Sequence, residues 1–264
     1  MSDHRTMTTR RLLAIVEYDG TDFHGFQVQK RRRTVQGELE KALHRVTSEK
    51  IRVTGAGRTD TGVHAAGLGV HFDTAWNRSL PVLQRALNAV LTTDVAIREL
   101  GETPPDFSAR FSARSRAYRY TILNQAVRAP LAERYALRIS QPLDAAAMDA
   151  AAQWLIGQHD FGAFGTPPRG DNTVREMHSA QVRRDGERLL IDLKANAFLY
   201  RMVRRIVGTL IWVGQGTLNL DGFREVLEKK RRAGESVPPH GLCLIAVEYD
   251  LQGLQLVGAK HENF

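Results

Sequence analysis

The first hundred residues contain hydrophobic patterns that predict strands and helices in turn. Apolar residues dominate 12–18, which indicates a strand, and residues 51–54 and the alternating 68–72 indicate two more. Two helices are predicted, one through about residue 46 and one from Ser79 and Pro81 to about Leu91. The first helix is expected to begin at Thr34, which suits an N-cap, because the apolar residues after it keep helical spacing: Val35, Leu39, Ala42, Leu43 and Val46.

The second half contains a weaker version of the same alternation. It predicts a strand at 118–123, a helix at 143–156, strands around Gln181 and Leu190, a helix at 198–213 and a strand at 244–249. The pentapeptide DFGAF (160–164) resembles DFHGF (22–26), a likeness that fits both an internal duplication and chance. We expect an α+β protein of two similar halves, residues 11–112 and 113–264, with mostly antiparallel sheets flanked by helices and a cleft between the halves. We expect residues 1–10 to form an N-terminal tail outside the two halves.

Positive charge is concentrated in short runs. Lysine and arginine outnumber the acidic residues by 37 to 29, for a formal net charge of +8, and two runs stand out: Lys30-Arg31-Arg32-Arg33 and Lys229-Lys230-Arg231-Arg232. Such runs favour a polyanionic partner such as nucleic acid, although a basic surface that only confers solubility gives the same composition. A single cysteine, Cys243, excludes an intrachain disulfide. With no signal peptide and no long apolar run, we expect a cytoplasmic protein without a membrane span.

The loop VTGAGRTDTGVHA (53–65) carries one carboxylate, Asp60, among glycines. A phosphate-binding loop would need lysine and a hydroxyl residue after the last glycine, where Val63 and His64 stand. The triplet DTG is that of aspartic proteases, but those enzymes need two such carboxylates, and this chain has one triplet. A nucleophilic carboxylate kept ionised by Arg58 remains, beside the alternative that Asp60 only caps its own turn.

Seven blocks of the sequence resemble, in order and spacing, the TruA family of tRNA pseudouridine synthases. They are YDGTDFHGFQ, TVQGELEKAL, GAGRTDTGVHA, FSARFSARSRAYRY, HDFGAF, FLYRMVRRIVGTL and GLCLIAVEY, spread over about residues 11–250. Departures are small: Phe26 stands where the family often has tryptophan, and Thr61 where it usually has a smaller residue. The resemblance implies the pseudouridine synthase fold and the isomerisation of uridine at positions 38–40 in the anticodon stem-loop of tRNA. It also implies that neither a metal nor an organic cofactor is needed.

The resemblance also implies roles for individual residues. Asp60 corresponds to the catalytic nucleophile, which attacks either the anomeric carbon of the sugar or the uracil ring. Arg58 is expected to hold the flipped nucleotide or fill its place, and Tyr118 to stack on the uracil, although Tyr120 lies on the same strand face.

Arg204 matches the arginine of the family's MVR and is expected to pair with Asp60. Arg201 and Arg205 are expected on the helix edge that faces solvent or RNA. Leu244 corresponds to an apolar residue placed against the catalytic tyrosine, with Leu242 as a rival. His64 is expected to be satisfied by backbone groups, and no histidine spacing suggests a metal.

The resemblance finally implies a homodimer that binds tRNA. Two other functions remain open, the same chemistry on another RNA and a non-catalytic RNA-binding protein.

Overall fold

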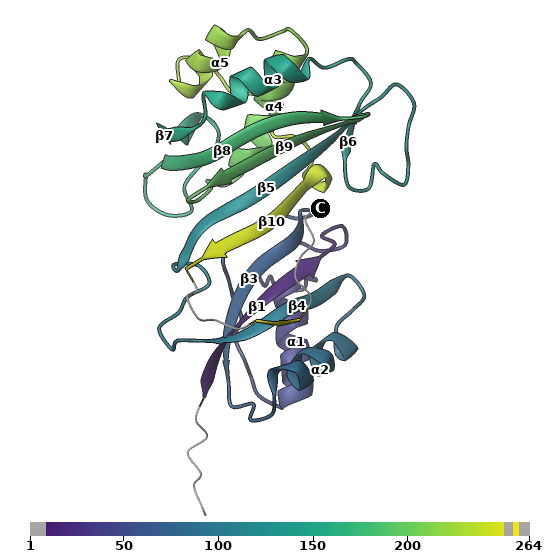
Figure 1. Ribbon diagram of the computed structural model, residues 1–264, viewed down its shortest axis with the longest axis vertical. Coiled ribbons are helices and arrows are strands. Elements are labelled where there is room, and N and C mark those ends of the chain that lie inside the picture. Colours follow the sequence, from purple (N-terminus) through teal and green to yellow (C-terminus); the bar gives the residue numbers. More distant parts are fainter. Residues whose placement is uncertain (1–8, 251–255, 259–264) are drawn as a thin grey trace, which may run out of the picture. The chain divides into compact units, whose positions relative to one another are not determined.

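The computed structural model describes residues 9–250 and 256–258, which form two compact units. Unit 1 comprises Met1–Arg114 and Ala246–Phe264, and unit 2 comprises Ser115–Ile245. Most of the proposed tail, residues 1–8, lies outside the described residues. Both units combine helices with mostly antiparallel strands, which confirms the expected α+β class (Figure 1). No helix in the described part of the chain is long and apolar enough to cross a membrane.

Unit 1 contains an antiparallel sheet in the order β11-β4-β1-β3, with the short β2 paired to β3. Two helices cover one face of this sheet. The elements are β1 (Arg10–Tyr18), α1 (Val35–Thr47), β2 (Thr54–Gly55), β3 (His64–Thr74), α2 (Leu80–Val90), β4 (Val95–Thr103) and β11 (Val257–Gly258).

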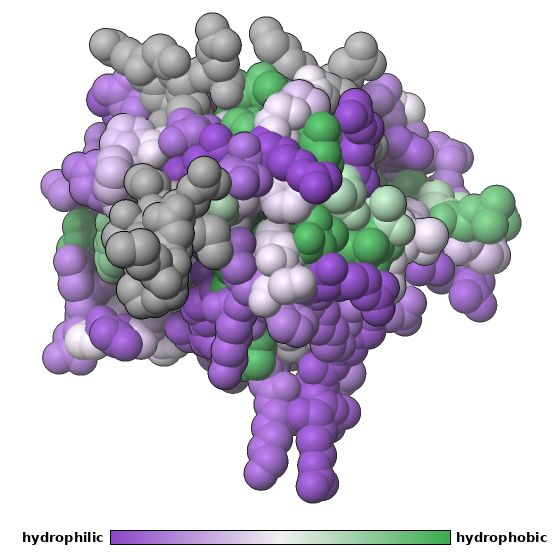
Figure 2. All heavy atoms as spheres, turned by 90° about the horizontal axis from the view of Figure 1, so that it is seen from below, coloured by the Kyte–Doolittle hydropathy of each residue, from purple (hydrophilic) through white to green (hydrophobic). Residues whose placement is uncertain are grey.

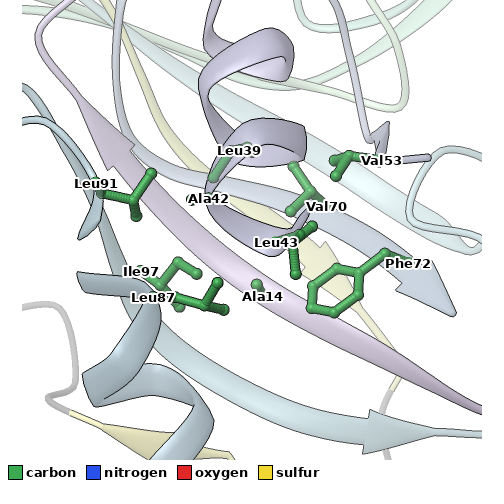
Figure 3. A pocket seen from close by; sticks show the side chains of 10 residues that line it. All are labelled: Ala14, Leu39, Ala42, Leu43, Val53, Val70, Phe72, Leu87, Leu91 and Ile97. Carbon is green, nitrogen blue, oxygen red and sulfur yellow. The ribbon is translucent and has the colours of Figure 1, made fainter. Parts of the chain in front are cut away.

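The core of unit 1 forms where apolar side chains of α1 and α2 meet those of β1, β3 and β4. These side chains point toward one another and leave a cavity of about 10 Å³ with an entirely apolar lining (Figure 3). A space of this size and chemistry is a packing defect with no room for a substrate. The lining residues are Ala14, Leu39, Ala42, Leu43, Val53, Val70, Phe72, Leu87, Leu91 and Ile97.

The opposite face of the unit 1 sheet is covered by a segment from the end of the chain and by the loop after β4. Leu13 packs against Phe107 and Ala109, with Tyr249 against the same cluster. The Tyr249 hydroxyl donates to the Ala109 carbonyl at 2.9 Å and lies close to Gly69. Residues 246–249 therefore complete the core of unit 1 although nearly all of unit 2 precedes them in the sequence.

Unit 2 contains the strand order β5-β9-β8-β7, antiparallel throughout, with β6 added in parallel to β5. Helix α3 packs against β8 and α4, and α5 contacts both helices. The elements are β5 (Ala113–Asn124), β6 (Leu137–Ile139), α3 (Ala145–Gln153), β7 (Gly157–Asp160), the 3-10 turn η1 (Phe161–Ala163), β8 (Val174–Asp185), β9 (Arg188–Ala195), α4 (Met202–Gly214), α5 (Leu220–Leu227), η2 (Pro239–Gly241) and β10 (Leu242–Tyr249). Residues 113–114 of β5 and residues 246–249 of β10 belong to unit 1.

Local sequence accounts for most of the element boundaries. The Thr34 hydroxyl accepts from the Gly37 amide and caps α1 as predicted, and α2 begins after Ser79 with Pro81 in its first turn. Helix α3 begins after its cap Asp144 and ends at Gln153, so it is shorter than the predicted 143–156 at both ends. Helix α5, which is not among the predicted elements, is capped by Asn219.

Two predicted elements are wrong in extent. Residues 51–53 form no strand because α1 side chains bind the backbone there: Gln36 Nε2 donates to the Val53 carbonyl at 3.0 Å, and the Val53 amide donates to Glu40 at 3.1 Å. Helix α4 begins at Met202 instead of residue 198. Arg201 has a left-handed φ of 62° and the Tyr200 amide donates to the Thr166 carbonyl, so the chain is not helical before residue 202.

The pentapeptides 22–26 and 160–164 have one structural feature in common. Phe23 and Phe26 are buried in unit 1, and Phe161 and Phe164, at the corresponding positions, are buried in unit 2. In each unit, two phenylalanines three residues apart therefore anchor a loop in the core.

Candidate active site

The loop that carries Asp60 connects β2 to β3. A hydrogen bond between two buried hydroxyl groups holds it against the core of unit 1. The Tyr18 hydroxyl, at the end of β1, lies 2.7 Å from the Thr59 Oγ1, and both side chains are buried. A hydrogen bond between two buried hydroxyls is costly to lose, because either group alone would be unsatisfied in the core. Thr59 therefore points inward and sets the position of the residue that follows it.

The segment 20–26 supports the same loop by close backbone contact. Gly25 has a φ of +78°, and a Cβ placed on it would lie 2.6 Å from the Thr59 carbonyl oxygen. A Cβ on Gly20 would overlap the Val63 carbonyl oxygen still more closely. Such overlaps exclude any side chain, so glycine is required at both positions. The two glycines of YDGTDFHGFQ thus hold the Asp60 loop, a role that the sequence motif alone did not reveal.

Backbone hydrogen bonds complete this support. The Phe26 amide donates to the Thr59 carbonyl at 3.2 Å, and the Gly62 amide donates to the Phe23 carbonyl at 3.4 Å. Within the loop, the Val63 amide donates to the Asp60 carbonyl at 3.2 Å and closes a turn. Asp60 therefore lies on a loop whose backbone is bound on both sides of it.

Asp60 itself is partly buried, whereas Arg58 is exposed. Among the described residues Arg58 takes part in no ion pair, so no salt bridge joins it to Asp60. The reason is local: Thr59 turns inward to Tyr18, and the residue before it faces solvent. Arg58 is consequently available to a ligand.

His64 is buried and is bound by the backbone, as predicted. The Gly20 amide donates to its Nδ1 at 3.0 Å, and Asp19 Oδ1 lies 3.1 Å from the same nitrogen. The described residues contain no group of three or more His, Cys, Asp or Glu side chains that could hold a metal ion.

In unit 2, the two tyrosines of β5 have different environments. Tyr120 is fully buried, its hydroxyl donates to the Pro238 carbonyl at 2.8 Å, and burial raises the pKa of its phenol. Tyr118 is only partly buried, and its ring contacts Phe198 edge to face at a centroid distance of 5.0 Å. Of the pair, Tyr120 is the packing residue, which leaves Tyr118 as the candidate for stacking on a base.

The arginines at the start of α4 also differ. Arg204 is partly buried, and its Nε donates to the Val237 carbonyl at 2.6 Å, while the Val237 amide donates back to the Arg204 carbonyl at 3.3 Å. Arg205 is exposed, as predicted. Arg201 is exposed too, but it precedes the helix and its guanidinium lies over the Tyr200 ring at 5.0 Å.

Leu242 and Leu244 lie on the same face of β10, and both are buried, with 5% and 1% of their surface exposed. Burial therefore does not separate the two candidates.

Comparison with known proteins places these features in a family. The family model described as tRNA pseudouridine synthase matches residues 14–112 and 151–250. The chain belongs to this family. The match includes Asp60, Arg58, Arg204 and Leu244, while Tyr118 falls between the two matched segments.

Curated relatives extend the similarity to nearly the full length. A protein of Brevibacillus brevis is 44% identical over 91% of this chain and 100% of its own length. One of Chloroflexus aurantiacus is 47% identical over 91% and 89%, and one of Herminiimonas arsenicoxydans is 41% identical over 98% and 96%. Each of the three is named tRNA pseudouridine synthase A. The expected family is thereby confirmed, and with it an isomerase.

Proposed function

We propose that this protein converts uridine to pseudouridine at positions 38–40 in the anticodon stem-loop of tRNA. Family membership and the names of its relatives support this function. The observation that carries it is the single carboxylate of the family motif, Asp60, partly buried on a loop that Thr59, Gly20 and Gly25 hold in place. A reactive group needs such fixed positioning, because misplacement lowers the rate steeply.

The reaction needs one nucleophile and no change of oxidation state. The bond between the sugar carbon C1′ and N1 of uracil breaks, the base turns, and a bond between C1′ and C5 forms. The hydrogen of C5 leaves as a proton, and N1 gains one, so atoms and electrons balance. Asp60 is the nucleophile in this proposal, either toward C1′ or toward the uracil ring.

The other predicted residues bind the substrate in this proposal. The target base must leave its stack, which costs a few kcal/mol. Stacking on Tyr118 would return about 1–3 kcal/mol. Arg58, exposed and without an ion pair among the described residues, holds the flipped nucleotide or fills its former position. Arg204 also binds the substrate in this proposal, and Leu244 provides an apolar contact.

Recognition of the tRNA would depend on shape and phosphates more than on base edges, which suits an enzyme that accepts three neighbouring positions. The protein would act in the cytoplasm as a homodimer, a state inferred from the family resemblance.

Replacing the carboxylate of Asp60 tests the proposal. Asp60→Asn keeps the size of the side chain and removes the nucleophile, so pseudouridine formation should fall below detection. Affinity for tRNA, which phosphate contacts dominate, should change less than about threefold. Release of tritium from tRNA labelled at C5 of uridine measures the rate, since the hydrogen at C5 is lost only when the new bond forms.

The control is Thr61→Ala, a change at an exposed position of the same loop that should leave the rate within about threefold of wild type. An active Asp60→Asn variant would refute the assignment of the nucleophile.

Chemical labelling of pseudouridine before mass spectrometry locates the product. Product outside positions 38–40 would indicate the same chemistry on another RNA site. Binding without any product would indicate a non-catalytic RNA-binding protein.

A further inference from the structure

The two basic runs of the sequence have different electrostatic surroundings. In the run 229–232, each cation faces a carboxylate in unit 2. Lys229 pairs with Asp160, and Lys230 lies 2.7 Å from Glu228. Arg231 and Arg232 lie 3.9 and 3.8 Å from Glu225 and Glu235. Four basic side chains are matched by four acidic ones, so this run presents little net positive charge to a polyanion.

The run 30–33 is different because only its last member is paired. Arg33 donates to both carboxylate oxygens of Asp94, at 2.7 and 2.9 Å, and its guanidinium lies 4.1 Å from the centre of the Phe23 ring. The three residues before it, Lys30, Arg31 and Arg32, are exposed and form no ion pair within residues 9–250 and 256–258. We call Lys30, Arg31 and Arg32 the basic turn. It presents three uncompensated positive charges.

The basic turn is held by the same segment that supports the Asp60 loop. The His24 amide donates to the Arg33 carbonyl at 2.9 Å, and Gln29 Nε2 donates to the His24 carbonyl at 2.6 Å. Arg32 Nη1 lies 3.3 Å from His24 Nε2. The next residue, Gly25, contacts the backbone of residues 59–61.

His24 therefore anchors the basic turn, and the residue next to it contacts the backbone of the Asp60 loop. Arg31 has a φ of 59°, in the left-handed region, which is uncommon for a residue with a side chain. Three cations are thus presented from a defined turn beside the candidate nucleophile. Figure 2 shows one face of the molecule, on which hydrophilic residues predominate.

We propose that Lys30, Arg31 and Arg32 bind the phosphates that flank the target uridine, and that the run 229–232 does not take part in binding. The proposal deepens the function proposed above and rests on it. A uridine that reaches Asp60 brings its neighbouring phosphates close to the turn. Each neutralised phosphate releases counterions, which makes binding depend on salt.

Two triple variants with equal loss of charge test the proposal. One replaces Lys30, Arg31 and Arg32 by glutamine, and its matched control replaces Lys230, Arg231 and Arg232 by glutamine. The dissociation constant for unmodified tRNA is measured at several salt concentrations. In the first variant, the slope of log K against log salt should become less steep by about 2–3, and affinity at low salt should fall about tenfold or more. In the control, the slope should change by less than about 0.5 and affinity by less than about threefold.

A charge-preserving variant checks that folding is not the cause. Lys30→Arg, Arg31→Lys and Arg32→Lys together should restore the wild-type slope, and the unfolding midpoints of all variants are compared. Equal changes in the two triple variants would overturn the proposal, as would an unchanged slope in the first.

Tritium release by the wild type is measured on the same tRNA. A wild type that binds with the expected slope pattern but releases no tritium would refute the proposed function and leave only binding of tRNA phosphates by the basic turn supported.

Discussion

Gly25 is the residue whose environment bears most directly on the candidate nucleophile. Its left-handed φ of +78° and its contact with the Thr59 carbonyl oxygen exclude a Cβ on two independent grounds. Gly186, in the turn between β8 and β9, has a similar φ of +57°, but a Cβ added there would have no heavy atom within 4 Å. Substituting each glycine in turn therefore distinguishes the effect of backbone strain, common to both, from the effect of pushing a neighbouring loop away, which is expected only at Gly25.

We predict that Gly186→Ala lowers the free energy of unfolding by about 1–2 kcal/mol, because alanine is strained at positive φ. Gly25→Ala should lower it by more, because its methyl group also overlaps the Thr59 carbonyl oxygen. Only Gly25→Ala should reduce pseudouridine formation, by about tenfold or more, since its methyl group would push the Asp60 loop away. Urea unfolding and tritium release measure the two effects. Similar activity in both variants would show that the loop tolerates displacement.

At the scale of elements, two arginines at the start of α4, three residues apart in the sequence, have different environments. Arg204 is partly buried and tied to Val237, whereas Arg201 is exposed and lies over Tyr200. We predict that Arg204→Ala lowers the turnover rate at least tenfold and Arg201→Ala less than about threefold. Arg204→Lys keeps a charge without the Nε donor, so it should recover little. Equal losses from the two alanine variants would refute the assignment of Arg204.

The 3-10 turn η1 depends on one carboxylate. Asp160 accepts from the Gly162 amide at 2.9 Å and from the Thr173 hydroxyl, and pairs with Lys229. Lys229, Thr173 and the Gly162 amide together hold the pKa of Asp160 to about 2, below its ordinary value of 3.8. The folded state therefore favours the ionised form, which stabilises the protein above about pH 4. This stabilisation is lost as the pH falls from about 4 to about 2.

We predict that Asp160→Asn lowers the free energy of unfolding by about 1 kcal/mol or less at about pH 6, since the Asp160 side chain is 39% exposed and solvent screens its charge. The difference from wild type should shrink below about pH 4 as Asp160 becomes protonated. Urea unfolding at about pH 6, 4 and 3 measures it. A difference that is constant over this range would contradict the electrostatic role.

At the scale of the whole molecule, the hydrophobic pattern predicted most helices and strands because both units bury apolar side chains in the usual way. It failed where side chains replaced the expected backbone partners, as at Val53, which Gln36 and Glu40 bind. Helix α5 was missed although its signal is present: Asn219 as a cap and Phe223 among apolar residues at helical spacing.

The candidate site was only partly predictable. Asp60 was found from a motif, because a lone carboxylate among glycines is rare. Tyr18 and Gly25, which support its loop, are 42 and 35 residues before it in the sequence. No pattern within the loop itself indicates that these two residues contact it. Spacing along the chain also does not show which way neighbouring side chains turn, since Arg58 is exposed and Thr59, the next residue, is buried. Charge composition likewise gave both basic runs equal weight, and only the positions of the carboxylates separate them.

Tyr249 has a consequence for the order in which the protein is made. Its ring packs on Leu13 and Phe107, and its hydroxyl binds Ala109, so the core of unit 1 needs a residue that follows unit 2 in the sequence. During synthesis, the sheet face of unit 1 that Tyr249 covers therefore stays uncovered until all of unit 2 has been translated. Unit 1, which carries Asp60, is thus begun before unit 2 and its core is completed only after unit 2 has been made.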